Sequence, residues 1–354
     1  MHRGAARLFL FGFLLFLFGP PSGAQPEKSP PEESFGDEIT VSLVPMVIRV
    51  VDTWGRPILG LKPEDFRVRV GKKDVPVAGL DWIAAGETEP PPSPSEPLEA
   101  EGVEIETAEA PLPGRLVVIF VQADLNPTRI SGQLRLRPYT RELLGSLHPG
   151  DRVAVVSYDS HLKLWQDFTP DRGVVHAAVD EAMLFSGERQ IAPGDPVSLA
   201  SHLDPQAARE AASPERALEV MARALEPLPG EKMVIYLGWG LGRFGNGGVK
   251  MTPDYKPAVK ALGAARASVF VLDVTSADYH SLEVGLEGVA EATGGLYLKT
   301  FRLPSLATDT LAQTISGYYV LSLDRASIGE EDGKVRIDLR QKKGTVLARS
   351  TALR

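Results

Sequence analysis

The chain has 354 residues, of which 43% are hydrophobic and 24% charged, and these ordinary values exclude a mostly disordered protein. Its formal net charge of −8 excludes a general affinity for nucleic acid or anionic lipid, because phosphate would repel it. It contains no cysteine, so disulfides, cysteine-ligated zinc and thiol nucleophiles are excluded as well.

The first residues have the three-part order of a secretory signal peptide. Arg3 and Arg7 precede an apolar run over residues 8–18, and small residues follow at 22–24. The run is too short to cross a bilayer comfortably. We therefore expect residues 1–24 to be removed and the product to be exported, either to the periplasm or outside the cell, with a retained N-terminal anchor as the alternative. The mature chain contains no later apolar stretch of membrane-spanning length, so we expect no transmembrane segment in it.

Two polar segments frame a small group of strands. Residues 25–37 are rich in Pro, Glu and Ser and are predicted to be a disordered tether. Residues 38–84 contain short runs of Val and Ile separated by turns, and alternation at residues 66–70 predicts a half-buried strand. They are predicted to form a small β domain. Residues 85–114, rich in Pro and Glu, are predicted to be a flexible linker.

From residue 115 to 317 apolar strands alternate with amphipathic helices, which predicts a mainly parallel sheet covered by helices on both faces. A helix is predicted at 138–147, and Thr169, Ser213 and Thr252 are predicted to cap later helices. The stretch 186–212 is predicted to be a long irregular insertion with a functional or flexible role. Strands in 318–354 are expected to pack against those of 38–84, because neither set is large enough alone.

Two stretches of sequence carry a resemblance to a known family. They are "GRPILGLKPEDFRV", in the first group of strands, and "RLVVIFVQADLNPTRISG" followed by "LHPGDRVAVVSYDS", which begins the alternating region. The chain resembles the von Willebrand factor A (vWA) family, and more closely an exported bacterial subgroup of it. The resemblance implies a doubly wound, mainly parallel α/β sheet with one antiparallel hairpin strand, flanked by a small β domain built from N-terminal and C-terminal strands.

The resemblance also implies where a metal would bind. Domains of this family hold a divalent cation with a D-x-S-x-S loop after the first strand, a Thr in a second loop and an Asp after the fourth strand. Here the first loop offers Asp124, Asn126 and Thr128, but the fourth-strand loop reads Gly238-Trp239 instead of Thr-Asp. No equivalent of the second-loop Thr is evident in 186–201. One carboxylate would hold Mg²⁺ weakly, so the site is expected to be degenerate; alternatively, Asp124 only caps its loop.

A binding site is expected in the same place even without a metal. In an open α/β sheet, ligands bind outside the carboxyl ends of the strands, where the strand order reverses. We expect Asp124, Trp239 and Arg243 to contact a partner there. Trp239 has two interpretations: an interface anchor on a glycine-rich loop, or a side chain that folds back onto the core.

Two motifs have the form of catalytic signatures. Residues 240–245 match G-x-G-x-x-G, and Asp273 ends the following strand, as in dinucleotide-binding proteins. However, the helix is predicted to start near residue 253, too late for its N-terminus to meet a pyrophosphate. Ser160 and Lys163 match S-x-x-K, but in a strand they point to opposite faces. The histidines are scattered and have no paired zinc-ligand spacing.

We therefore expect a non-catalytic protein-interaction module with a protein partner, no small-molecule substrate and no obligatory cofactor. The first alternative is a cation-dependent adhesion protein, in which Asp195 or Asp204 of the insertion replaces the missing acid. The second is a nucleotide-binding enzyme that uses the glycine-rich loop.

Overall fold

The computed structural model describes residues 43–85, 114–184, 191–194, 197–328, 333–340, 343–350 and 352–353. The predicted signal peptide, the tether and nearly all of the predicted linker lie outside these ranges, so they remain predictions. Among the described residues, no helix is both long and apolar enough to cross a membrane.

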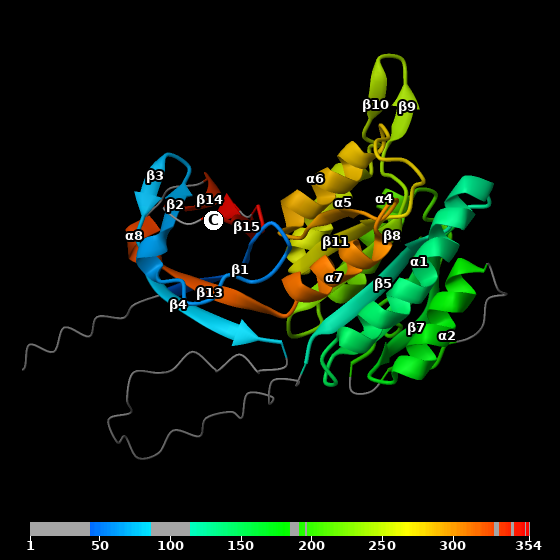
Figure 1. Cartoon of the computed structure of the whole chain (residues 1–354), viewed down its shortest axis with the longest axis horizontal. Helices are drawn as coiled ribbons and strands as arrows, with labels where there is room; N and C mark the ends of the chain where they lie inside the picture. The colour runs from blue at the N-terminus through cyan, green and yellow to red at the C-terminus, as the bar shows by residue number, and fades with distance from the viewer. Residues whose placement is uncertain are drawn as a thin grey trace, which may run out of the picture. The chain divides into compact units, whose positions relative to one another are not determined.

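The N-terminal and C-terminal strands together build two antiparallel sheets (Figure 1). The first sheet has the order β15 (Thr345–Ala348), β1 (Leu43–Val51), β13 (Gly317–Asp324), β4 (Val77–Ala84). The second has the order β16 (Ala352–Leu353), β14 (Gly333–Leu339), β2 (Phe66–Val70), β3 (Lys73–Val75). Short helices η1 (Pro63–Asp65) and α8 (Arg325–Ile328) accompany them. The alternating residues of β2 and β14 share one apolar core with β1 and β13. This confirms the expected packing of the two sets of strands.

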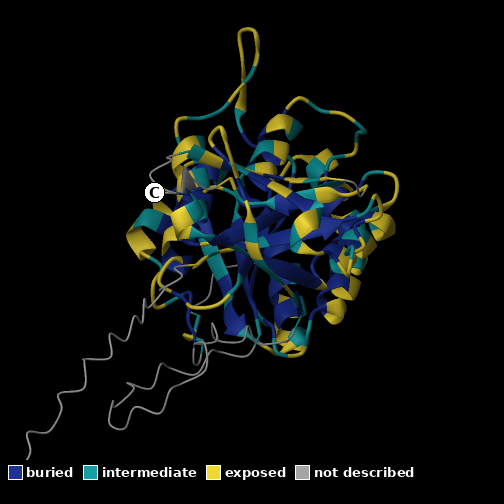
Figure 2. Ribbon diagram, turned by 90° about the vertical axis from the view of Figure 1, so that its left-hand side faces the viewer, coloured by how far each residue is buried: buried dark blue, intermediate teal, exposed yellow. Residues whose placement is uncertain are grey.

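The central sheet has six strands in the order β7 (Leu162–Thr169), β6 (Arg152–Tyr158), β5 (Leu116–Gln122), β8 (Lys232–Gly238), β11 (Ala267–Asp273), β12 (Tyr297–Lys299). All neighbouring pairs are parallel except β6 and β7, which form an antiparallel hairpin. Every residue of β5, β8 and β11 is buried, because helices cover both faces of the sheet (Figure 2). The expected fold class is confirmed.

Two helical layers enclose this sheet. One consists of α1 (Pro127–Ser146), α2 (Arg172–Met183) and α7 (Pro304–Thr314). The other consists of α3 (Pro205–Arg209), α4 (Pro214–Leu225), α5 (Tyr255–Ala264) and α6 (Glu283–Thr293). Alternate residues of β5 enter different cores: Val117, Ile119 and Val121 face the first layer, whereas Val118 and Phe120 face the second.

Several local predictions are wrong in detail. The helix predicted at 138–147 is the second half of α1, which begins eleven residues earlier at Pro127 and carries Pro138 inside it. Asp171 caps α2, not Thr169, because its carboxylate accepts the amide hydrogens of Gly173 and Val174. Ser213 caps α4 as predicted. The third cap position is Asp254 instead of Thr252, and its side chain makes no capping bond.

The predicted insertion is ordered in its described part, residues 191–194 and 197–212. The buried carboxylate of Asp167 accepts hydrogen bonds from the amides of Gly194 and Leu199 at 2.8 and 2.7 Å and from the hydroxyl of Ser198 at 2.6 Å. Helix α3 follows and buries Ala208. The described residues 191–194 and 197–204 form no helix or strand, as predicted for an irregular segment, and one buried acid organises their backbone; the short helix α3 was not predicted.

The amino edge of the central sheet holds two buried ion pairs. Arg115 lies beside β5 and bonds both carboxylate oxygens of Asp151, at 3.0 and 2.6 Å, and these side chains are 6% and 0% exposed. Arg49 of β1 pairs with Glu231, next to β8, and its guanidinium lies against the rings of Phe270 and Tyr318. The second pair ties the antiparallel sheets to the central one.

Candidate functional site

The loops that follow β5, β8 and β11 meet at one edge of the central sheet, because these strands are parallel neighbours. We call residues 123–126, 239–254 and 274–282 the carboxyl rim. The strand order reverses at β5, which has β6 on one side and β8 on the other. The carboxyl rim is therefore the place where an open α/β sheet is expected to bind a ligand.

The first loop of the carboxyl rim uses its polar groups internally. Asp124 accepts the amide hydrogen of Asn126 at 2.7 Å and forms an ion pair with Arg129 on the first turn of α1. The Asn126 side chain caps α1 by accepting from both the amide and the hydroxyl of Thr128, at 3.0 and 2.7 Å. All three residues predicted as metal ligands therefore have partners within the first loop or the first turn of α1.

Arg129, on the first turn of α1, and Trp239, on the second loop, form a stack. The guanidinium carbon lies 3.2 Å from the centre of the indole ring. The half-buried ring also packs against the core formed with α1, α2 and α7. Trp239 thus contacts the core, as one interpretation held, and also supports the cation that neutralises Asp124.

The backbone of the second loop is held by the side chain of the last residue of β5. The buried amide of Gln122 accepts from the backbone of Trp239 at 2.9 Å and donates to the carbonyl of Gly240 at 2.9 Å. A Cβ at Gly238 would lie 2.1 Å from the ring of Tyr236 and 2.6 Å from the Gln122 oxygen. This position has no room for a hydroxyl ligand, and the next residue is an indole.

These observations test whether the rim fits the cation that vWA-like domains hold. One carboxylate is present at the first loop, and a guanidinium is already bound to it. The one acid of the second loop, Asp254, lies at the start of α5 and accepts the Ser213 hydroxyl at 2.7 Å. Hard cations prefer several oxygen ligands, and affinity rises with their charge. The residues at Asp124 do not fit a Mg²⁺ site. Asp204, one predicted substitute, caps α3 instead, and Asp195 lies outside the described residues.

The glycine-rich stretch forms a hairpin, not a phosphate-binding turn. It contains β9 (Arg243–Gly245) and β10 (Gly248–Lys250), and α5 begins only at Tyr255. Figure 1 shows this hairpin projecting beyond the edge of the sheet. Since no helix N-terminus follows the glycines, the dinucleotide interpretation of 240–245 is wrong.

The hairpin presents different chemistry on its two faces. Arg243 lies directly opposite Lys250, and Phe244 lies opposite Val249. Like charges in this arrangement repel each other. Neither cation has an ion-pair partner among the residues that the structure describes. Phe244 is 67% exposed.

Large apolar side chains are exposed on each of the three rim loops. They are Leu125 after β5, Phe244 after β8 and Tyr279 after β11, with exposed fractions of 74%, 67% and 81%. A single exposed apolar residue needs no explanation, whereas exposed apolar side chains gathered on neighbouring loops are a feature of many interaction sites.

A polar network at the end of β11 was missed by the sequence analysis. The buried carboxylate of Asp273 receives the Tyr297 hydroxyl at 2.5 Å and a ring nitrogen of His280 at 2.7 Å. Glu283, the first residue of α6, is 3.3 Å from the same hydroxyl and pairs with Lys299 at 2.8 Å. Paired histidines are not part of this group, because the neighbours of His280 in it are carboxylates. The spacing of His280 and Glu283, three residues apart at a helix start, was the available signal.

The charge state of this network follows from its contacts. Burial by itself would raise the pKa of Asp273, but the bonds from His280, Tyr297 and the Thr275 amide outweigh it and leave that pKa below the usual value. Burial and the neighbouring Asp273 carboxylate raise the pKa of Tyr297. Asp273 is therefore a buried anion and Tyr297 a neutral donor at neutral pH.

The S-x-x-K motif has another role. Lys163 pairs with Asp159 at 2.7 Å, and the Ser160 hydroxyl donates to the same carboxylate at 2.9 Å. These bonds tighten the turn between β6 and β7. The arrangement is a structural turn.

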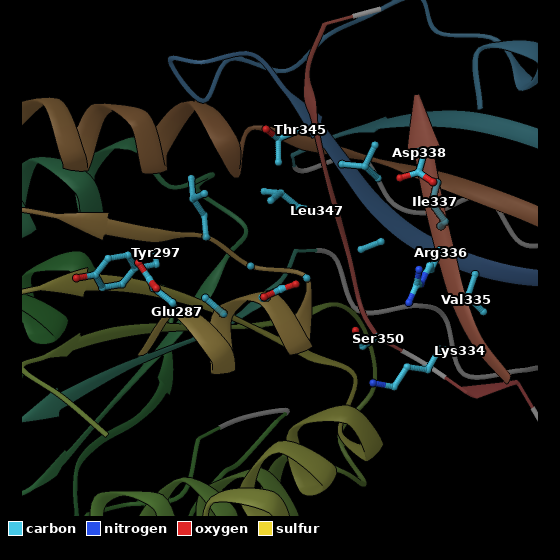
Figure 3. Close-up of a pocket in the computed structure, with 17 residues that line it drawn as sticks. Glu287, Tyr297, Lys334, Val335, Arg336, Ile337, Asp338, Thr345, Leu347 and Ser350 are labelled. Atoms are coloured by element: carbon cyan, nitrogen blue, oxygen red, sulfur yellow. The ribbon is translucent and has the colours of Figure 1, made fainter. Parts of the chain in front are cut away.

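A separate hollow of about 800 Å³ lies between α6 and strands β14 and β15 (Figure 3). Glu287 of α6 is on one wall and Lys334 and Arg336 of β14 are on the other. The ring of Tyr297 lines the hollow, and Figure 3 shows its hydroxyl pointing away from it. The hydroxyl thus belongs to the Asp273 network and not to the hollow.

The strand order, the antiparallel edge strand and the two helical layers define a vWA-like α/β domain. No protein-family model matches the chain. No curated protein matches it either.

Solved structures with similarity to the chain include several from bacteria. The conserved hypothetical protein BatB from Bacteroides thetaiotaomicron has a TM-score of 0.39 and 16% identity, covering 57% of this chain and 98% of its own. An aerotolerance-related membrane protein from Bacteroides fragilis, solved with multiple mutations to serine, has a TM-score of 0.37 and 13% identity. The match covers 56% of this chain and 98% of that protein. A von Willebrand factor type A structure from Catenulispora acidiphila has a TM-score of 0.39 and 13% identity. The match covers 66% of this chain and 65% of that protein. Because these scores are low, the fold assignment rests on the strand order.

Proposed function

We propose that this chain is an exported, non-catalytic interaction module that binds a protein partner through its carboxyl rim without a metal ion at Asp124. The observation that carries the proposal is the exposure of Leu125, Phe244 and Tyr279 on three adjacent loops at the switch point of the sheet. Aromatic and large apolar side chains are the usual anchors of protein interfaces.

The hairpin indicates the chemistry of the partner. Arg243 and Lys250 face each other across β9 and β10, so an acidic group placed between them would relieve their repulsion. The chain as a whole is acidic, with a net charge of −8, and would repel such a partner elsewhere. The favoured partner is therefore a protein surface that combines acidic residues with an apolar pocket for Phe244.

The ion pair of Asp124 with Arg129 supports binding without a metal. In this arrangement the Arg129 guanidinium, held by the Asp124 carboxylate and the Trp239 indole, occupies the place beside the carboxylate that a metal ion would take. Such a cation is permanent, whereas a bound metal can be removed. Binding should therefore persist in a chelator and weaken as salt screens the hairpin charges.

The test is capture of partners from the native cell envelope by the full chain and by rim variants. Phe244→Ser and Arg243→Glu should each release the same captured protein. Val174→Ser is the matched control, because Val174 is an exposed apolar residue on α2 with 40% exposure, outside the rim. If the control releases the partner as strongly as Phe244→Ser, or if neither rim variant changes the capture, the rim is not the binding surface.

Export needs its own measurement. Fractionation of cells that produce the full chain should place a product beginning near Gln25 outside the cytoplasm. Recovery of the intact N-terminus in the cytoplasm would contradict the predicted signal peptide.

A further inference from the structure

Three metal-ligating groups converge at the end of β11, on segments that the fold holds firmly. Asp273 is the last residue of β11, His280 lies in the loop after it and Glu283 begins α6. Their ligand atoms, one from each side chain, all lie within 4.8 Å of one another. The loop of His280 is fixed because Lys299 donates to the carbonyl of Asp278 at 2.7 Å.

The hydrogen-bonded distances are close to those of a coordination shell. Zinc is bound by histidine nitrogen and carboxylate oxygen at roughly 2.0–2.2 Å, which places tetrahedral ligand atoms about 3.3 Å apart. The His280 nitrogen and the Asp273 oxygen are now 2.7 Å apart, with a hydrogen between them. If these side chains moved by about an ångström, a cation could take the place of that hydrogen, and Glu283 would be its third ligand.

The charges and the donor types select the cation. Asp273 and Glu283 contribute two carboxylates. In the structure, Lys299 forms an ion pair with Glu283. An imidazole ligand favours zinc and related transition metals, whereas Mg²⁺ and Ca²⁺ take oxygen ligands only. The mixed set therefore fits Zn²⁺ better than the hard cations.

The site is accessible from one side. The Asp273 side chain is 2% exposed, while those of His280 and Glu283 are 18% and 16% exposed. A cation there would have a buried ligand beneath it and solvent above it. Three protein ligands and one open position are typical of zinc sites that take a further ligand.

We propose that Asp273, His280 and Glu283 bind a zinc-like divalent cation with an open fourth position, beside the third loop of the carboxyl rim. This site is one strand away from β8 and uses none of the residues of the Asp124 loop. It is independent of whether a protein partner binds to Phe244 and the hairpin.

The test is titration of the metal-free full chain with Zn²⁺, Mn²⁺ and Mg²⁺, measured by calorimetry and by thermal unfolding. We expect Zn²⁺ to bind with one-to-one stoichiometry and to raise the melting temperature, and Mg²⁺ to do neither. His280→Gln and Glu283→Gln should each weaken Zn²⁺ binding by more than about 100-fold, since loss of an outer-shell partner alone costs about 10–100-fold.

Three further variants show whether the bound Zn²⁺ lies at this cluster. His202→Gln changes an exposed histidine far along the chain and should leave Zn²⁺ binding intact. Asp124→Asn removes the carboxylate of the first loop and should also leave it intact. Lys299→Gln removes the charge that competes for Glu283 but keeps an N–H donor for the Asp278 carbonyl, and it should tighten binding several-fold, which a purely structural role for the network would not produce.

The opposite pattern would overturn the proposal. Zinc binding that survives His280→Gln, that is lost in Asp124→Asn, or that is absent at submillimolar Zn²⁺ would show that the cluster is only a hydrogen-bond network. Because His280 and Glu283 are partly exposed and glutamine keeps a polar side chain of similar size, their variants are expected to fold, and far-ultraviolet circular dichroism of each variant checks this.

Discussion

The two edges of the central sheet are built for different purposes. At the amino edge, Arg115 and Asp151 are almost completely buried and make bidentate contacts. At the carboxyl edge, Asp124 and Arg129 keep 25% and 30% of their side chains exposed. The same two residue types, one arginine and one aspartate, are thus a buried anchor at one edge and a solvated pair at the other.

This contrast shows how one fold separates stability from recognition. Breaking a buried pair leaves an uncompensated charge, whereas an exposed pair is screened by water. The carboxyl edge also carries the exposed side chains of Leu125, Phe244 and Tyr279. Substitutions at the amino edge should therefore destabilise the fold, and those at the carboxyl edge should change binding with little effect on stability.

The largest effect is expected for Asp151→Ala. It leaves the Arg115 guanidinium buried without its carboxylate and removes the acceptor of the His148 amide, 3.0 Å away. The free energy of unfolding should fall by about 3–5 kcal/mol. Urea unfolding followed by circular dichroism measures this. If Asp151→Ala lowers the free energy of unfolding less than Arg129→Ala does in the solvated pair, the amino edge is not the more stabilising of the two edges.

Arg49→Ala should have the next largest effect. Its side chain is 2% exposed, pairs with Glu231 and contacts the rings of Phe270 and Tyr318. We expect a loss of about 2–4 kcal/mol, because the change leaves Glu231 unpaired and creates a cavity. Arg56→Ala is a matched control, since Arg56 makes a similar pair with Asp52 but is 60% exposed. Equal losses for both variants would mean that burial does not set the strength of these pairs.

The sequence predicted the buried strands well, because each one is a continuous apolar run bounded by turns. Residues 116–122 and 232–238 are buried along their whole length, as such runs require. It did not predict the pairing of Asp124 with Arg129. That pair depends on α1 beginning at Pro127, and the expected start at Pro138 placed residue 129 in a loop.

The Asp273 network was hidden for a related reason. Its members are separated by up to 24 residues, from Asp273 to Tyr297, and they meet only because β11 and β12 are parallel neighbours. A pattern search within one segment finds His280 and Glu283 but cannot supply the strand pairing. Local periodicity thus determined the elements, while the site depended on register and on helix starts.

Lys232 makes the amino edge sensitive to alkaline pH. Burial lowers the pKa of Lys232 to about 8, and its amine donates to the carbonyl of Ala265 at 3.1 Å. Between about pH 8 and 10.5 the unfolded chain binds a proton that the folded chain has released, so this group makes stability rise with pH in that window. Lys232→Met should remove the rise and add about 1–2 kcal/mol near pH 7, after allowance for solvent screening. Unfolding curves at pH 7 and pH 10 measure both, and an unchanged slope in the variant would contradict a buried amine.

The smallest change in stability is expected for Arg129→Ala at the carboxyl edge, about 0.5–1 kcal/mol, because the pair with Asp124 is partly solvated. The guanidinium lies 3.2 Å from the ring centre of Trp239, so the variant should nevertheless alter tryptophan fluorescence. It also frees the Asp124 carboxylate at the switch point of the sheet. If Arg129 supplies the positive charge that a partner recognises, Arg129→Ala should weaken capture while Arg129→Lys restores part of it. Full capture by the alanine variant, or a stability loss as large as that of Asp151→Ala, would mean that the two edges do not divide recognition from stability.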